Sequence, residues 1–385
     1  MAAEETLSAE DVALIRQTAH RFVRERLVPL EAGIDAADEV PAGLLAALRA
    51  EANALGLYGF NLPAALGGPG LPVEARLAVL EELTYTSVPL SEVLGYLPLS
   101  LRFCSPTQCQ TLLPALRCGE QTMTYALTEP GTGSDLSALR TRGQKVEGGW
   151  QLNGAKQFIS HAETADFILV LALTDATASL KGRLTTFLLR KGNPGLVGMT
   201  RYRKMGWRGY HLNGFSLENC FVPDEDLLGA PGQGFAVMME SINHDRIFSA
   251  SRSLGLARRA HELSCAYAKE RRAFGAPLAD HQAIQMMIAD NDVEIAAARL
   301  LIGEGARSID RGAPDARIAA ARAKLYASEM GCRVADRALQ IFGGMGYMAE
   351  LPLERFYRDA RAFRIGEGTS EMQRIQIARS ALASA

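Results

Sequence analysis

Apolar positions along the first third of the chain recur with the period of an α-helix. Near the N-terminus this period is carried by Val12, Ile15, Ala19 and Phe22. Stretches rich in Ala, Leu and Glu repeat the period up to about residue 120, with breaks at Pro63, Gly67-Gly68-Pro69 and Pro89. We therefore predict an all-helical N-terminal domain over residues 1–121.

The pattern changes from about residue 122, where short runs of β-forming residues replace the helical period. Val146 and Trp150 flank Gly148-Gly149, and two further runs lie at Phe167 to Leu173 and Thr185 to Leu189. Gly, Asn and Pro bound these runs, as is typical of strands joined by turns. We predict a middle β-barrel-like domain over residues 122–230.

Long helical patterns return after Pro231-Gly232-Gln233-Gly234. One predicted helix carries its apolar face on Ile284, Met287, Ile288, Ile295, Ala298 and Ile302. Residues 231–385 are therefore predicted to form a C-terminal helical bundle domain. The resulting helix, sheet and helix order indicates an α+β fold of three domains.

Composition and charge exclude several classes of protein. The chain has 385 residues, of which 48% are hydrophobic and 22% charged, so it can bury a substantial core. A formal net charge of −2 argues against a nucleic-acid partner, and no apolar run reaches the eighteen or so residues of a membrane-spanning helix. The first six residues lack the features of a targeting peptide, which favours a cytoplasmic location.

The six cysteines lack the spacing of a metal site or a disulfide framework. We expect no metal, and thiols that are reduced and mostly buried at Cys104, Cys109, Cys118, Cys220, Cys265 and Cys332.

Three segments have residue types suited to a polar ligand, and each also has a purely structural explanation. The loop Thr128–Asp135 combines glycines with hydroxyls, but a glycine-rich connection explains it equally well. Arginines in Glu270–Gly275 suit phosphate, although a solvated basic helix end is also stabilised by the helix dipole. The glycines of Gln340–Tyr347 are typical of a helix C-terminus.

The fourth segment, Arg364–Gln373, contains a carboxylate at a helix start. Ser370 and Gln373 have the spacing of a capping box, and an apolar face follows on Met372, Ile375, Ala378 and Leu382. A helix is thus predicted to begin near Thr369. Glu367 lies between two glycines just before it, where the backbone can approach a ligand and a carboxylate is favoured. Glu367 can serve there as a base, or as an exposed carboxylate that stabilises the helix.

Taken together and in this order, these segments resemble the acyl-CoA dehydrogenase family, from about residue 10 to residue 380. The resemblance implies FAD as cofactor, an acyl-CoA substrate, and a C-terminal four-helix bundle. In Asn153–Ser160 the family's usual Trp and Thr are replaced by Phe158 and Ser160, and Ser160 keeps the hydroxyl expected at flavin N5. The residues that the resemblance places on FAD are Thr128, Ser134, Phe158, Ser160, Arg271, Phe274, Gln282, Gln340, Gly344 and Thr369.

The resemblance also implies that some FAD contacts cross a subunit interface, so that the protein is a homo-oligomer, a dimer or a tetramer. It places the substrate against Ser134, Asn243, Arg246, Gly366 and Gly368. Arg246 would also support the catalytic centre.

Two carboxylates compete for the role of base. Glu367 matches the base of the short- and medium-chain branches, whereas Asp245 occupies the place from which the long-chain and isovaleryl branches supply theirs. We favour Glu367 because Asp is shorter by one methylene, and we interpret Asp245 as an ion-paired or satisfied polar group.

The expected reaction is dehydrogenation of an acyl-CoA to a trans-2-enoyl-CoA, with electrons passed to electron-transfer flavoprotein. An acyl-CoA oxidase that uses oxygen, or a scaffold without catalysis, remain alternatives. Gly366 stands beside the base where straight-chain relatives often carry a bulkier residue, so we hypothesise room for a branched, cyclic or aryl acyl group.

Overall fold

The first third of the chain is helical, as predicted. The computed structural model describes residues 7–179 and 181–383, so the targeting prediction made on residues 1–6 lies outside the described residues. Pro89 lies within the first turn of a short helix rather than between helices, because proline is tolerated at that position. The N-terminal helices are α1 (Ala9–Phe22), α2 (Glu31–Ala37), α3 (Ala42–Ala54), α4 (Val73–Leu83), α5 (Val88–Ser91), α6 (Pro106–Thr111) and α7 (Leu113–Cys118).

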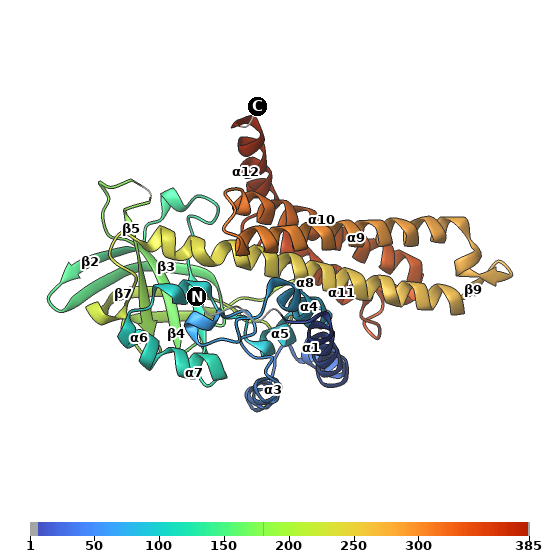
Figure 1. The fold of residues 1–385 in the computed structure, drawn as a ribbon, viewed down its shortest axis with the longest axis horizontal. Helices are drawn as coiled ribbons and strands as arrows, with labels where there is room; N and C mark the ends of the chain where they lie inside the picture. Colours follow the sequence, from blue (N-terminus) through green and yellow to red (C-terminus); the bar gives the residue numbers. More distant parts are fainter. Residues whose placement is uncertain (1–6, 180, 384–385) are drawn as a thin grey trace.

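An eight-stranded sheet forms the middle of the chain (Figure 1). Its strands are β1 (Met123–Ala126), β2 (Arg142–Val146), β3 (Gly149–Ser160), β4 (Phe167–Leu173), β5 (Leu184–Arg190), β6 (Leu196–Arg201), β7 (Leu212–Pro223) and β8 (Leu227–Leu228). The strand order is β6-β7-β3-β2-β4-β5-β8, and β1 pairs with β4 in parallel. Both β-rich runs predicted from the sequence are strands, β4 and β5.

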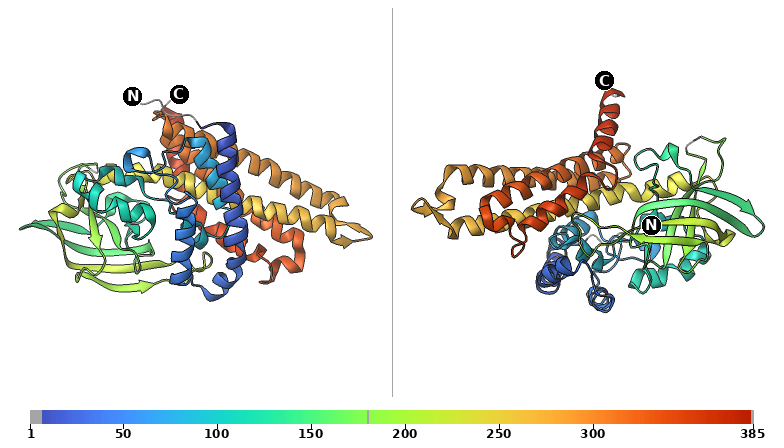
Figure 2. Two further views of the ribbon diagram at one scale, coloured as in Figure 1. Left: turned by 60° about the horizontal axis from the view of Figure 1, so that its bottom comes forward. Right: turned by 180° about the vertical axis from the view of Figure 1, so that it is seen from behind.

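The last third is helical again, and its longest helix ties the molecule together. The helices are α8 (Gly234–Glu270), α9 (Gln282–Asp310), α10 (Ala316–Phe342), α11 (Leu353–Ala360) and α12 (Ser370–Ala383), with a two-stranded ribbon of β9 (Arg272–Ala273) and β10 (Ala276–Pro277) after α8. In Figures 1 and 2, α8 runs from beside the sheet to this distant ribbon, alongside α9 and α10.

The helices predicted at the apolar period of α9 and near Thr369 are confirmed. Helix α12 projects away from the body of the chain in Figure 1. Its predicted apolar face is therefore exposed, with Ile375 42% and Leu382 79% accessible.

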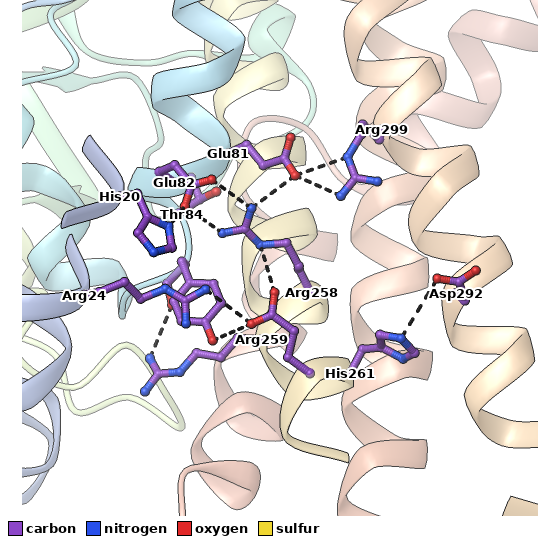
Figure 3. A network of polar contacts seen from close by, with 12 residues as sticks. His20, Arg24, Glu81, Glu82, Thr84, Arg258, Arg259, His261, Asp292 and Arg299 are labelled. Carbon is purple, nitrogen blue, oxygen red and sulfur yellow. Dashed lines mark hydrogen bonds and ion pairs between the residues drawn. The ribbon is translucent and has the colours of Figure 1, made fainter. Parts of the chain in front are cut away.

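Ion pairs join the N-terminal helices to α8 and α9, as Figure 3 shows. Arg258 on α8 contacts Glu81 and Glu82 on α4, each at 3.1 Å, and Arg299 on α9 reaches Glu81 at 2.8 Å. His20 on α1 lies 2.9 Å from Glu82. Because Glu82 is almost fully buried, this network is screened less by salt than a surface pair.

The prediction of free thiols is confirmed, whereas the prediction that most of them are buried is wrong. All six thiols are free, but Cys220 alone among these six is buried, and the other five are partly exposed. Within residues 7–179 and 181–383, no helix combines the length and apolar character needed to cross a membrane.

Candidate active site

Glu367 lies in a tight turn between the short helix Arg361–Arg364 and α12. Its φ is +49° and that of Gly368 is +87°, so a non-glycine residue occupies the left-handed region here. Two buried side chains hold the turn: Lys324 Nζ donates to the Gly368 carbonyl at 2.6 Å, and Gln373 Nε2 donates to the same oxygen at 2.9 Å. Gln373 also donates to the Glu367 carbonyl at 3.3 Å.

The capping box predicted on Ser370 is wrong by one residue. Thr369 Oγ1 accepts from the Met372 N–H at 3.3 Å, and Gln373 turns back onto the Glu367 turn instead of onto Ser370. The cause is the left-handed turn, which makes Thr369 the last residue before the helix. Thr369 is therefore engaged by its own helix.

The second candidate carboxylate, Asp245, lies on α8 and is close enough to the Glu367 turn to be influenced by the charge of Glu367. Burial, followed by the charge of Glu367, raises the pKa of Asp245 well above its ordinary value. Arg246 opposes this effect, but Arg246 Nη1 donates to Asn243 Oδ1 at 3.2 Å, and its Nε is buried without a partner in the described part of the chain. Burial lowers the pKa of Arg246 to about 10. The structure thus brings Asn243, Asp245, Arg246 and Glu367 together.

A β-bulge presents Phe158 and Ser160 to this region. The pairing of β3 with β7 shifts register between Lys156 and Ile159, and such a bulge redirects the side chains beside it. Phe158 has a φ of +60° and is 52% exposed. The Gln157 N–H donates to the Thr128 carbonyl at 2.9 Å, which fastens the loop containing Thr128 next to the bulge.

Tyr210 connects the bulge to the Glu367 turn. Its hydroxyl hydrogen-bonds to Ser160, and it lies within the electrostatic influence of both Glu367 and Asp245. Burial raises the pKa of Tyr210 to about 12, so it stays protonated at neutral pH. Nearby, the Trp207 indole donates to the Asp359 carbonyl at 3.0 Å, and this contact joins the loop before β7 to α11.

The loop Thr128–Asp135 owes much of its shape to Glu129 inside it. The Glu129 carboxylate accepts from the Arg140 and Thr141 N–H groups at 2.7 and 2.9 Å, and from Lys156 Nζ at 2.9 Å. Glu129 is buried, whereas Ser134 is exposed and Thr128 partly so. A buried anchor therefore leaves the hydroxyl side of the loop accessible.

The other predicted cofactor residues lie at the far end of the helical bundle. A stacked pair, Tyr267 of α8 and Phe342 of α10 with ring centroids 4.1 Å apart, places the ends of these helices side by side. At 1.5 Å per residue, α8 alone carries the chain roughly 36 Å from Arg246 to Glu270. Phe274 is 99% exposed there. The residues of this far group are Arg271, Phe274, Gln282, Gln340 and Gly344, and none of them meets the Glu367 turn of the same chain.

Space is available beside the turn at Gly366. A Cβ added there would come no closer than 3.9 Å to its nearest neighbour beyond the adjoining residues, the Ala362 carbonyl oxygen. At Gly368 an added Cβ would instead lie 2.8 Å from Gln373 Nε2. Gln373 could move aside, but the φ of +87° at Gly368 disfavours any side chain there, whereas neither packing nor backbone conformation requires glycine at 366.

Sequence reasoning missed Lys324 and Tyr210, and it assigned Gln373 to a capping box rather than to the turn that carries Glu367. Lys324 carried a usable signal, because it lies on the apolar face of its helix between Ala320 and Ala327, both fully buried. Tyr210 carried none, since its role depends on a loop whose path no local pattern predicts.

Comparison with known proteins gives three family matches that together span nearly the whole chain. The models are those of the acyl-CoA dehydrogenase N-terminal domain over residues 9–120, the middle domain over residues 124–220 and the C-terminal domain over residues 232–382.

Individual relatives agree with these matches. The chain is 37% identical over 370 residues to the short-chain specific acyl-CoA dehydrogenase, mitochondrial, of Homo sapiens. The aligned region covers 95% of this chain and 88% of that protein. The butyryl-CoA dehydrogenase structure from Megasphaera elsdenii superposes with a TM-score of 0.90, at 31% identity, over 98% of this chain and 100% of that one. A chain in the structure of the electron transferring flavoprotein of Acidaminococcus fermentans superposes with a TM-score of 0.91, at 33% identity, over 98% and 99% of the two chains.

Proposed function

Because the chain belongs to the acyl-CoA dehydrogenase family, we propose that it is an FAD-dependent enzyme that oxidises an acyl-CoA thioester to the trans-2-enoyl-CoA. The observation that carries the proposal is the convergence of Glu367, Arg246 and the Ser160–Tyr210 pair, from three separate parts of the chain, on one region.

Glu367 is proposed as the base that removes the α-proton. An α-proton of a thioester is weakly acidic, so it requires a positioned carboxylate and donors for the developing enolate oxygen. Family resemblance assigns those donors to the Glu367 backbone N–H and a flavin hydroxyl. Asp245 suits this role less well, because burial and the charge of Glu367 raise its pKa well above the ordinary value and so oppose its ionisation. Arg246 follows Asp245 on α8, and its charge lowers the pKa of Asp245 in opposition to burial.

The residues on the β side fit the flavin ring. An exposed aromatic ring at Phe158 and a hydroxyl at Ser160, oriented by Tyr210, stand at the end of β3 next to the loop containing Thr128. Thr128, Ser134, Phe158, Ser160 and Thr369 would hold this end of FAD. The bound cofactor supplies the hydride acceptor at N5, while the protein orients the substrate and excludes water.

The far group of predicted cofactor residues fits a second copy of the chain. These residues lie at the far end of the bundle, too far from Ser160 to bind one FAD together with it in the same chain. They would instead bind the diphosphate and adenosine of the FAD held by a partner subunit. The residues are Arg271, Phe274, Gln282, Gln340 and Gly344. An exposed apolar stripe on α9 suits such an assembly: Met286 is 58%, Val293 66% and Leu300 72% accessible. We therefore propose a homo-oligomer.

The substrate is proposed to carry a branched, cyclic or aryl acyl group, because Gly366 leaves room beside the base. Asn243 and Arg246 would contact the CoA arm, and Gly366 and Gly368 the thioester. Electron-transfer flavoprotein is the proposed acceptor, in keeping with the name of one of the structural relatives.

Anaerobic reduction of the flavin tests the proposal. A panel of straight, branched, cyclic and aryl acyl-CoA thioesters is added to the purified protein, and the band near about 450 nm is followed. Bleaching by one class identifies the substrate, and preference for butyryl- to octanoyl-CoA would refute the role given to Gly366. Bound flavin that no thioester reduces would favour the scaffold, and rapid reoxidation by oxygen with release of peroxide would favour the oxidase.

Glu367→Gln tests the base. We expect it to slow flavin reduction by about 100- to 10,000-fold, the range found for general bases, while substrate still binds. Unchanged reduction in Glu367→Gln would transfer the role to Asp245.

A further inference from the structure

Lys324 is a buried cation directly beneath the turn that carries Glu367. It lies on α10, its side chain is fully buried, and its ammonium donates to the Gly368 carbonyl at 2.6 Å. Gly368 is the residue immediately after the proposed base. A contact of this kind fixes the peptide that orients Glu367.

The turn requires such a contact because its backbone is unfavourable. Glu367 has a φ of +49°, which costs energy for a residue with a side chain and persists only where surrounding groups enforce it. Gln373 supplies a second donor to the Gly368 carbonyl, but from the helix that the turn itself starts. Lys324 is the donor that comes from the rigid helical bundle.

Packing alone does not account for the lysine. Its neighbours on the same face of α10, Ala320 and Ala327, are small and fully buried, so an apolar side chain would suit this position. Among the described residues, the hydrogen bond donated by the Lys324 ammonium goes to one carbonyl, whereas the other fully buried lysine, Lys156, donates to three acceptors. A buried charge with few partners lowers stability. A role in placing the turn that carries Glu367 would explain why a lysine stands here despite this cost in stability.

We propose that Lys324 is a positioning residue, whose buried ammonium fixes the Glu367–Gly368 turn so that the carboxylate is aimed at the α-carbon of the substrate. This inference rests on the proposed role of Glu367 as the base. Lys324 acts through the turn and makes no contact with the reacting atoms.

The charges around Lys324 agree with this role and give it a pH signature. Glu367 and Glu371 face it from the turn and α12, Glu329 from its own helix, and Arg246 from α8. Burial lowers the pKa of Lys324 to about 8, with Glu367 opposing the shift. As the pH rises through about 8, the lysine loses its charge, and its charge-assisted hydrogen bond to Gly368 weakens.

The test compares Lys324→Met, Lys324→Arg and the control Arg322→Met, each in the full-length protein loaded with FAD. Arg322 is exposed on the same helix, so its replacement removes the same unit of charge without touching the turn. We expect Lys324→Met to lower kcat by about 10- to 100-fold with KM little changed, as a displaced catalytic group does. Lys324→Arg should retain more activity than Lys324→Met, and Arg322→Met should match the wild type.

The pH profile separates positioning from a merely structural role. The wild type and Arg322→Met should lose activity as the pH rises through about 8, whereas Lys324→Arg should lack this limb because a guanidinium does not titrate there. The thermal midpoint of Lys324→Met should equal or exceed that of the wild type. A wild-type kcat in Lys324→Met would overturn the proposal. So would a loss of activity in Lys324→Met that is accompanied by a lower thermal midpoint and an unchanged decline of activity above about pH 8.

Hydrogen exchange of the amides at 366–372 provides a readout independent of catalysis. Lys324→Met should exchange faster there than the wild type and Arg322→Met, and equal exchange would contradict the contact's role. If the wild type reduces no acyl-CoA, the proposed function fails, while this exchange experiment still decides whether Lys324 holds the turn.

Discussion

Replacing Lys156 by Met would test whether one buried ion pair holds the loop proposed to contact the flavin. Lys156 lies on β3 with a fully buried side chain. Its ammonium donates to the Leu127 carbonyl at 3.0 Å, to Glu129 Oε1 at 2.9 Å and to the Leu171 carbonyl at 2.8 Å. The three N–H groups of the lysine are therefore all satisfied, and they join the residue that follows β1, strand β4 and the loop.

The structure sets the size of the expected effect. Removing one partner of a buried pair costs about 3–5 kcal/mol of unfolding free energy, because the other charge is left uncompensated. Glu129 retains the Arg140 and Thr141 N–H groups at 2.7 and 2.9 Å, so we expect the lower end of this range, about 3 kcal/mol. Adding Glu129→Gln to Lys156→Met should cost little more, since the two residues share one interaction.

The same pair predicts a dependence on pH. Burial lowers the pKa of Lys156 from 10.5 to about 8, and Glu129 opposes the shift. Between these two values the unfolded chain binds more protons than the folded one, so the unfolding free energy of the wild type should rise with pH across this window. Lys156→Met should lack the rise.

Urea unfolding, with flavin release followed by fluorescence, measures both effects. Lys145→Met is the matched control, because Lys145 pairs with Asp224 at the surface with both side chains 51% accessible. A surface pair contributes about 1 kcal/mol or less. Lys156→Met should release FAD at lower urea than the control. If Lys156→Met is no less stable than Lys145→Met, the pair does not hold the loop.

Three further predictions concern other parts of the molecule. Asp245→Asn should retain most of the flavin-reduction rate, because burial and the charge of Glu367 raise the pKa of Asp245 and so disfavour its ionised form, and loss of reduction would make Asp245 the base. Burial raises the pKa of Glu82, but Arg258 and His20 outweigh burial and lower this pKa from 4.5 to about 2. The wild type should therefore lose about 3 kcal/mol of unfolding free energy as the pH falls between these values. Acid unfolding of Glu82→Gln should lack this loss, and an equal loss would refute the assignment. Phe274→Ser should weaken FAD retention and subunit association, measured by dialysis and sedimentation velocity, while unchanged values would remove Phe274 from the interface.

Sequence periodicity was sufficient for the order of helical and β-rich regions and for several individual elements, although strands such as β6 and β7 were not predicted. The strand predicted at Phe167 to Leu173 has these bounds in the structure, and the apolar period of Ile284 to Ile302 lies within one long helix. Both patterns reflect burial on a face of a regular element, which local sequence specifies directly. The predicted capping box on Ser370 and Gln373 was wrong, because Thr369 caps the helix and Gln373 donates to the turn that carries Glu367.

Contacts between distant elements could not be predicted in the same way. Lys324 reaches Gly368 from another helix, and Tyr210 reaches Ser160 from a loop between two strands. Nothing local to either residue encodes its partner. A charged residue within an apolar helical face does indicate that a buried partner exists, and this signal would have singled out Lys324.

The competition between Asp245 and Glu367 illustrates what the structure adds to residue types. From the sequence both are carboxylates at plausible positions, and the preference for Glu367 depended on side-chain length and family resemblance. The structure places the two groups within each other's field, so that they cannot both be ionised at low cost. Asp245 lies on α8 where burial favours its neutral form, whereas Glu367 lies in an exposed turn at the start of a helix. The burial of Asp245 and the exposed position of Glu367 therefore support the proposal that Glu367, and not Asp245, is the base.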